Sequence, residues 1–114
     1  MGKFYDRQGK PINGDEWLYL SRDYEEVVLS RDVLDNVVVS TVWFGFDKAQ
    51  SHLNEDPALF ETIVYAADGS DLLPAIAVFD GAGYGSEEDA FDGHEEIVAL
   101  CEAYLARTTK NEQS

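Results

Sequence analysis

The chain has 114 residues, of which 23 are acidic and 8 are basic, so its formal net charge at pH 7 is −15. Such a surface repels nucleic acid and anionic membranes, and it attracts cations or basic proteins. The apolar fraction is 45%, and no apolar run approaches the roughly 18–20 residues of a membrane span. These values exclude a disordered chain and predict one globular domain over residues 1–114.

The cysteine content and the N-terminus predict the compartment. A single cysteine, Cys101, excludes an intramolecular disulfide and is typical of a reducing environment. Residues 1–6 lack the apolar stretch of a secretory signal. The expected location is therefore the cytoplasm.

The N-terminal quarter predicts an arm followed by a short helix. Residues 3–12 are typical of a short hairpin or an extended arm. Asn13 or Asp15 can cap a helix over residues 15–22, because both side chains accept hydrogen bonds from the first free backbone N–H groups. This helix is brief, so we expect tertiary contacts to hold it in place.

The longest apolar run in the chain, Asn36 to Asp47, predicts the central strand of the fold. It is rich in β-branched and aromatic side chains, and neither of its alternating faces is polar enough for full exposure. A preceding strand over residues 25–34 joins it through the two-residue turn Asp35-Asn36, so the two form a hairpin. Gly45 indicates a bulge or a close approach of another segment.

Two more strands and a long helix complete the predicted elements. Residues 47–57 form a polar loop whose length favours a role in binding. Strands are expected over residues 59–67 and 72–80. A glycine-rich link, Gly81 to Gly85, then leads into a helix over residues 87–107. The glycine spacing does not match a phosphate-binding loop, and the acids that follow would repel a phosphate.

The C-terminal helix has an apolar stripe that predicts how it packs. Its members recur at helical spacing: Ala90, Phe91, His94, Ile97, Val98, Cys101, Tyr104 and Leu105. Gly93 costs about 1 kcal/mol relative to alanine and indicates close packing. The expected fold is α+β. It has an antiparallel meander of about four strands, the long helix across one face, the short helix at an edge, and a frayed tail over residues 108–114.

The outward face of the same helix predicts a partner-binding surface. It carries seven acids without a lysine four residues away: Glu87, Glu88, Asp89, Asp92, Glu95, Glu96 and Glu102. Like charges at these spacings destabilise a helix by a few tenths of a kcal/mol each, so a function beyond local stability is one explanation for them. A row of carboxylates imitates the charge of a nucleic-acid backbone and fits a basic groove. Solubility is the alternative explanation.

A second hypothesis places a ligand pocket near Trp43, the loop over residues 47–57 and His94. Asp47 and His52 belong to this candidate set because they lie in or beside the loop. His94 has two interpretations, a buried histidine with satisfied hydrogen bonds or a catalytic or ligand-binding residue. The loop acids and His52 match no established metal-ligand spacing, and no cofactor is predicted.

Several segments resemble a family of small uncharacterised proteins found in bacteriophages and prophages. They are F-Y-D-R-Q-G-K-P-I at 4–12, V-S-T-V-W-F-G-F-D at 39–47, F-E-T-I-V-Y at 60–65 and G-S-E-E-D-A-F-D-G-H-E-E-I-V at 85–98. The family often has a histidine where this chain has Lys48. The resemblance implies a phage-encoded accessory protein that acts inside the host cell, and such proteins include inhibitors of host defence nucleases that mimic DNA.

These observations lead to one expected function and two alternatives. The first is a non-enzymatic acidic protein that binds a basic host protein and blocks its nucleic-acid site, with no direct binding to nucleic acid or membrane. The second is a small-molecule-binding protein or minor enzyme that uses the pocket near Trp43 and His94. The third is a structural accessory protein that works as a homo-oligomer.

Overall fold

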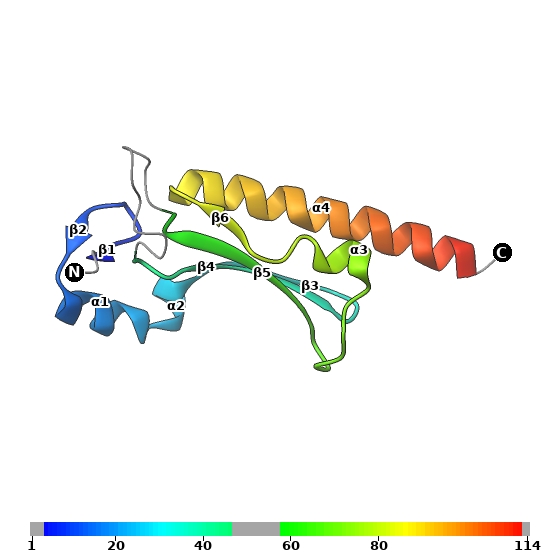
Figure 1. Ribbon diagram of the computed structural model, residues 1–114, viewed down its shortest axis with the longest axis horizontal. Coiled ribbons are helices and arrows are strands. Elements are labelled where there is room, and N and C mark those ends of the chain that lie inside the picture. The colour runs from blue at the N-terminus through cyan, green and yellow to red at the C-terminus, as the bar shows by residue number, and fades with distance from the viewer. Residues whose placement is uncertain (1–3, 47–57, 113–114) are drawn as a thin grey trace.

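The computed structural model describes residues 4–46 and 58–112, with side chains described as far as residue 107. It is an α+β fold in which a four-stranded antiparallel sheet carries a long C-terminal helix across one face (Figure 1). The strand order is β3-β4-β5-β6, the meander expected from strands joined by short connections. The fold class predicted from the sequence is therefore confirmed.

The hairpin at the centre of the sheet has the predicted turn. Strand β3 (Val28–Leu34) pairs with β4 (Val37–Trp43), and Leu34 lies opposite Val37. Asp35 has a φ of 55°, a left-handed conformation that aspartate tolerates in tight turns. Strand β4 also pairs with β5 (Phe60–Ala66), so the apolar run identified in the sequence is central, as predicted.

The first predicted strand begins later than expected. Residues Tyr24–Val27 form a short helix, α2, because the side chain of Asp23 accepts a hydrogen bond from the backbone N–H of Glu25 and caps that turn. The prediction of a strand over residues 25–34 is therefore wrong for its first three residues. The short sequence Glu26-Val27-Val28 fits a strand as well as a single helical turn, so the cap at Asp23 decides for the helix.

The fourth strand lies in a different segment from the one predicted. Residues 72–80 contain the short helix α3 (Pro74–Ala77), and β6 is formed by Ala82–Tyr84 in the glycine-rich link. Pro74 occupies the first turn of α3, where its missing N–H is not needed. Leu72, Ile76 and Phe79 recur at helical rather than alternating spacing, a signal that the strand prediction overlooked.

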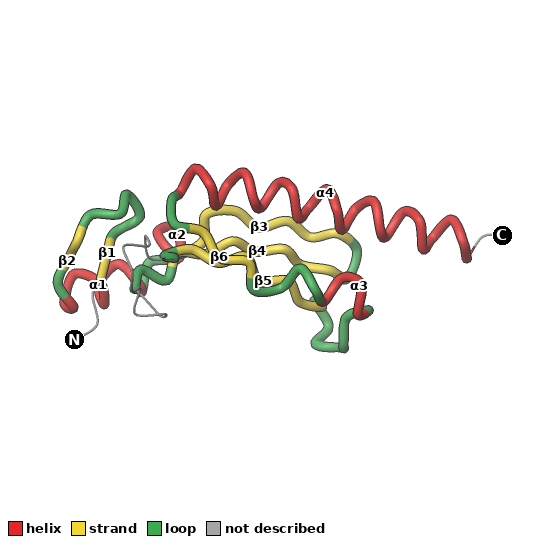
Figure 2. The backbone as a smooth tube through the Cα atoms, turned by 45° about the horizontal axis from the view of Figure 1, so that its top comes forward, coloured by secondary structure: helices red, strands yellow, loops and turns green. Residues whose placement is uncertain are grey.

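The N-terminal arm lies beside one end of the sheet (Figures 1 and 2). It comprises the hairpin β1 (Phe4–Tyr5) and β2 (Pro11–Ile12), followed by α1 (Gly14–Ser21). Of the two predicted caps, Asn13 is the one that the helix uses, so α1 begins one residue earlier than expected. The indole Nε1 of Trp17 donates to the carbonyl oxygen of Phe44 at 2.7 Å. This contact joins α1 to the end of the central strand.

Gly45 is the point at which the arm meets the sheet. Its φ is 74°, and a Cβ there would lie 2.4 Å from the ring of Trp43 and 2.9 Å from that of Trp17. Its carbonyl oxygen accepts a hydrogen bond from the backbone N–H of Tyr5 at 2.8 Å. The predicted close approach at this glycine is confirmed.

Helix α4 (Glu87–Glu112) covers the sheet and extends beyond it. At 1.5 Å per residue its 26 residues span about 39 Å, whereas a seven-residue strand spans about 23 Å. The molecule is therefore elongated, with extents of 56 × 31 × 23 Å (Figure 1). The helix continues to Glu112, where a frayed tail was expected from residue 108. Of the helices in the described part of the chain, none is long and apolar enough for a membrane crossing.

The core between α4 and the sheet consists of two apolar clusters with a polar layer between them. One cluster contains Val37, Val39, Val64, Ile76, Ile97 and Cys101. The other contains Trp43, Leu59, Phe60 and Ala90. The polar layer between the clusters contains one buried residue from each of three elements. They are Thr41 of β4, Thr62 of β5 and His94 of α4.

We predict that Gly93→Ala destabilises the protein although alanine favours helices. A Cβ at position 93 would lie 2.1–2.5 Å from ring atoms of Tyr84, so the tyrosine has to move. In a Tyr84→Ala background the same change should stabilise the protein by about 1 kcal/mol, the intrinsic helix preference. Urea unfolding of the four variants measures both effects. An equal effect of Gly93→Ala in the two backgrounds would contradict the contact.

Candidate functional site

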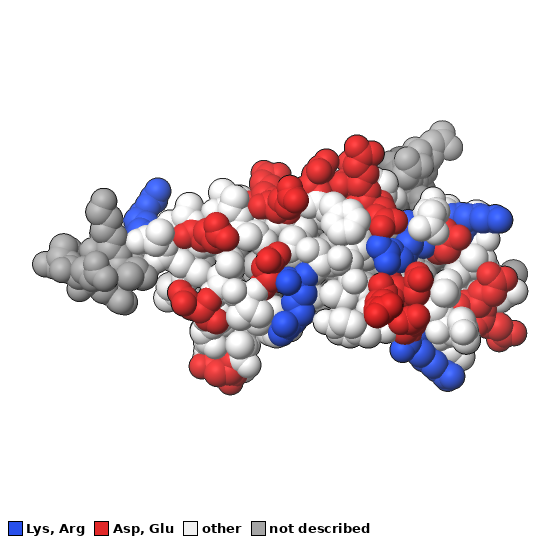
Figure 3. Space-filling model, turned by 180° about the vertical axis from the view of Figure 1, so that it is seen from behind, with Lys and Arg blue, Asp and Glu red and all other residues white. Residues whose placement is uncertain are grey.

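Helix α4 presents its acids opposite the face that packs on the sheet. Six of the seven predicted partner-binding residues are exposed: Glu88, Asp89, Asp92, Glu95, Glu96 and Glu102. The buried positions Ala90, His94, Ile97 and Cys101 alternate with them at intervals of three and four residues, which places the two sets on opposite sides of the helix. We call these six residues the acidic face. In Figure 3, acidic side chains gather along the upper edge of the molecule.

Glu87, the seventh predicted residue, has a different role. Its Oε1 lies 2.5 Å from Nη2 of Arg7 in the N-terminal arm, and both side chains are largely buried. Nη1 of the same arginine donates to the backbone carbonyl oxygen of Glu25. Glu87 is therefore engaged in joining the start of α4 to the arm, and its charge is compensated.

The first part of the acidic face has a linear charge density somewhat more than half that of DNA. Five carboxylates lie from Glu88 to Glu96, over about 12 Å of the helix axis, so neighbouring charges are on average about 3 Å apart along it. Double-stranded DNA carries about one charge per 1.7 Å of its axis. The sequence contains no lysine or arginine between Lys48 and Arg107, so no cation of α4 lies near these acids before the last turns.

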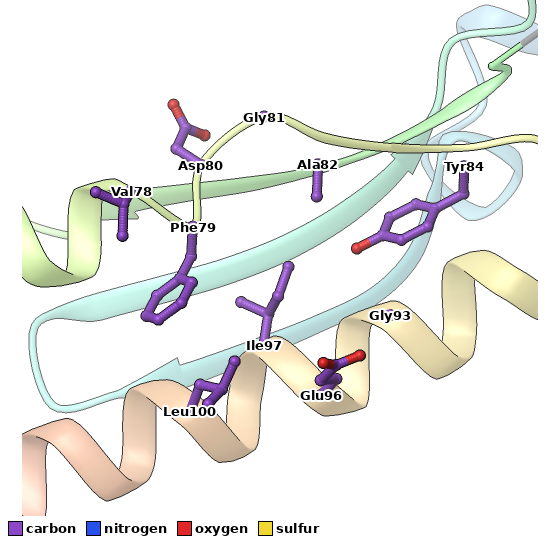
Figure 4. Close-up of a pocket in the computed structure, with 10 residues that line it drawn as sticks. All are labelled: Val78, Phe79, Asp80, Gly81, Ala82, Tyr84, Gly93, Glu96, Ile97 and Leu100. Atoms are coloured by element: carbon purple, nitrogen blue, oxygen red, sulfur yellow. The ribbon is translucent and has the colours of Figure 1, made fainter.

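A groove runs beside the acidic face, between α4 and the segment that joins α3 to β6 (Figure 4). Its volume is about 490 Å³, within the range of ligand pockets. Its lining is mainly apolar and consists of Val78, Phe79, Asp80, Gly81, Ala82, Tyr84, Gly93, Glu96, Ile97 and Leu100. Glu96 belongs to both the groove and the acidic face, so the two surfaces are continuous.

The shape of the groove depends on Gly93 and Tyr84. Because Gly93 has no side chain, the ring of Tyr84 lies against the helix backbone and closes one end of the groove (Figure 4). The carboxylate of Asp80 points away from α4, and its Oδ1 accepts a hydrogen bond from the backbone N–H of Val64 at 2.9 Å. Glu96 is therefore the lining carboxylate that lies nearest to a groove occupant.

A chain of hydrogen bonds crosses the core behind the groove. Nε2 of His94 lies 2.7 Å from Oδ2 of Asp32, and Nδ1 lies 2.7 Å from Oγ1 of Thr41. The hydroxyls of Thr41 and Thr62 are 2.6 Å apart, and the Thr62 hydroxyl donates to that of Tyr84 at 3.1 Å. We call these five residues the polar chain. It connects β3, β4, β5, β6 and α4.

The polar chain contains a carboxylate, an imidazole and a hydroxyl in the order found in hydrolase triads. Thr41 and Thr62 are both 0% exposed, however, so their hydroxyls cannot reach a substrate. A nucleophile must contact the atom that it attacks. The polar chain therefore fits a structural role, which agrees with the interpretation of His94 as a buried histidine with satisfied hydrogen bonds.

The residues of the predicted pocket are not brought together around a cavity that the structure describes. Trp43 is 2% exposed, and its Nε1 donates to the carbonyl oxygen of Tyr5 at 3.1 Å. His94 is equally buried, and neither residue lines the groove. Asp47, His52 and the loop over residues 47–57 lie outside the described residues. Within the described part of the chain, no group of three or more histidine, cysteine or carboxylate side chains is placed to hold a metal ion.

The polar chain and the groove were not predicted from the sequence. Thr41 and Thr62 each interrupt an apolar strand face, between Val39 and Trp43 and between Phe60 and Val64. A polar residue at such a position requires a buried partner, so this signal was available. The groove had no comparable signal, because it depends on a helix in the segment that was predicted to be a strand.

No protein-family model matches the chain, and neither the curated proteins nor the solved structures include a significant match. Its function has therefore to be inferred from its own residues.

The polar chain yields a prediction about stability. Thr41→Val keeps the shape of the side chain but leaves Nδ1 of His94 without its buried partner, so it should cost about 1–3 kcal/mol. Asp32→Ala removes a partner whose side chain is 50% exposed, and water can replace it, so it should cost less than about 1 kcal/mol. Guanidinium unfolding of both variants tests this order. A larger loss for Asp32→Ala would show that the hydrogen bond to the exposed carboxylate, not the one to the buried hydroxyl, holds His94.

Cys101 yields a prediction about reactivity and pH. It is fully buried on the side of α4 that packs on the sheet, and burial raises the pKa of its thiol above the ordinary value of 9.0. We expect no reaction of the folded protein with a thiol reagent at pH 8 and complete reaction in urea, because the exposed thiolate is the reactive form. The unfolded thiol loses its proton at a lower pH than the folded one, so stability should fall as the pH rises past 9.0. Rapid labelling of the folded protein would contradict this.

Proposed function

We propose that this protein is a non-enzymatic inhibitor that binds a basic protein through the acidic face of α4 and competes with nucleic acid for that partner's binding site. The observation that carries the proposal is the row of six exposed carboxylates, Glu88, Asp89, Asp92, Glu95, Glu96 and Glu102, on the side of α4 that faces away from the sheet. The five carboxylates from Glu88 to Glu96 have a linear charge density more than half that of DNA, which supports occupation of a groove built for phosphates.

The rigid mounting of α4 also supports the proposal. The Arg7–Glu87 ion pair holds the first turn of the helix, and the hydrogen bonds of His94 to Asp32 and Thr41 hold its second and third turns. The helix backbone that carries the carboxylates is therefore held on the sheet before a partner arrives. A prearranged charged surface loses less conformational freedom on binding than a flexible acidic tail does.

The class of partner is the least direct part of the proposal. The acidic face by itself favours any protein with a basic groove. The resemblance to phage and prophage proteins favours a host defence nuclease, and this choice depends on the resemblance alone. The inhibitor would then act in the host cytoplasm.

A capture experiment tests the proposed function. The immobilised protein should retain a basic nucleic-acid-binding protein from bacterial lysate, and excess duplex DNA should release it because both ligands occupy one site. Binding should weaken more than about tenfold between 50 and 200 mM salt, as charge-driven binding to nucleic-acid sites does. Mass spectrometry identifies the retained protein, and surface plasmon resonance measures its affinity. A partner that DNA does not displace would contradict the mimicry.

Matched charge reversals locate the binding surface. Asp92→Lys with Glu95→Lys should reduce affinity for the captured partner at least about tenfold, because both lie at the centre of the acidic face. Asp15→Lys with Asp71→Lys changes the net charge equally at exposed positions elsewhere and should reduce affinity much less. Equal losses would mean that net charge, rather than the acidic face, drives association.

A further inference from the structure

The groove beside the acidic face has exposed apolar side chains at its rim. Val78 is 73% exposed and Leu100 is 44% exposed, and they lie at its rim. Phe79, Ala82 and Ile97 lie deeper, between α3, β6 and α4 (Figure 4). Apolar side chains grouped at a concave surface favour an occupant that removes them from water.

The charges around the groove restrict the occupant to a cationic one. Its lining contains no lysine, arginine or histidine, and its ionisable carboxylates are Glu96 and Asp80. Asp80 is directed away from α4, so Glu96 provides the charge nearest to an occupant. Asp92 and Asp89 lie about one and two turns before Glu96 on the same helix and add to the negative potential. An anionic ligand, such as a nucleotide or a phosphorylated peptide, would be repelled.

We propose that the groove binds a segment of the partner protein in which a lysine or arginine neighbours a large apolar side chain. The apolar side chain packs between Phe79, Ile97 and Leu100, and the cation pairs with Glu96. This inference rests on the proposed function for the partner's basic character, and it adds the feature that selects one basic protein among many. Carboxylates alone attract every basic surface, whereas an apolar pocket beside them accepts only a matching segment.

Synthetic peptides provide the probe for this site. The probes are three capped ten-residue peptides. The first alternates leucine with lysine, the second serine with lysine, and the third leucine with glutamine. The leucine–lysine peptide should bind at least about tenfold tighter than either of the others, because only it supplies both interactions. Amide chemical shifts in ¹H–¹⁵N spectra should change at Ala82, Gly93, Ile97 and Leu100.

Matched variants at exposed positions separate the groove from the general charge. Glu96→Gln and Val78→Ser should each weaken binding of the leucine–lysine peptide by about three- to tenfold. Asp71→Asn makes the same charge change at an exposed residue outside both the groove and the acidic face, and Val33→Ser alters a valine of β3 that is 53% exposed. Both controls should change the affinity less than about twofold.

Three results would overturn the groove proposal. The first is unchanged shifts at the groove amides, and the second is equal effects of Asp71→Asn and Glu96→Gln. The third is a set of shifts that appear on raising the protein concentration without peptide, which would identify the groove as a contact between copies of the chain. In each case capture of a basic protein that DNA displaces would leave the proposed function standing. Conversely, peptide binding in the groove without any such partner would overturn the proposed function alone.

Discussion

The polar chain that crosses the core is the constraint on which the rest of the structure depends. Apolar contacts are non-directional, so two apolar clusters alone would let α4 slide or rotate on the sheet. Thr41, Thr62 and His94 occupy the middle of that interface, and each is fully or almost fully buried. Moving α4 by one residue would leave the imidazole without hydrogen bonds in an apolar layer, at a cost of about 1–3 kcal/mol. The network therefore selects one register of the helix, which is a role that buried polar groups have in other folds.

Fixing α4 in that register also fixes both candidate binding surfaces. With His94 facing the sheet, Asp92, Glu95 and Glu96 must face solvent. Residues one or two positions from His94 lie about 100° or 200° around the helix from it, and so point away from the sheet. The same register brings Gly93 beneath the ring of Tyr84 and so forms the end of the groove. The acidic face and the groove are thus consequences of one packing arrangement, and the Arg7–Glu87 ion pair secures its N-terminal end.

The sequence analysis was most successful where a single pattern decides the outcome. The β-branched run at residues 37–43, the turn at Asp35-Asn36 and the cap at Asn13 are local signals, and the structure has a strand, a turn and a helix start at these positions. The predictions for residues 72–80 and for the start of β3 were wrong. At the start of β3 a short segment fits a strand and a helical turn equally well, and the cap at Asp23 decides for the helix. In residues 72–80 the helical spacing of Leu72, Ile76 and Phe79 and the proline at position 74 favoured the helix that the structure has. The acidic set was recognised from composition, but the pairing of Glu87 with Arg7 was not, because 80 residues separate them.

The sequence by itself determined the central strands, the long C-terminal helix and the character of their faces. The period of the apolar residues and the excess of acids are local properties that survive any packing arrangement. Only the tertiary structure decided which polar residues meet. Asp32 and His94 are 62 residues apart, and Thr41 and His94 are 53 apart, so their contacts exist only once the helix lies on the sheet. The groove is likewise a product of packing, since its two walls come from separate segments that no local pattern brings together.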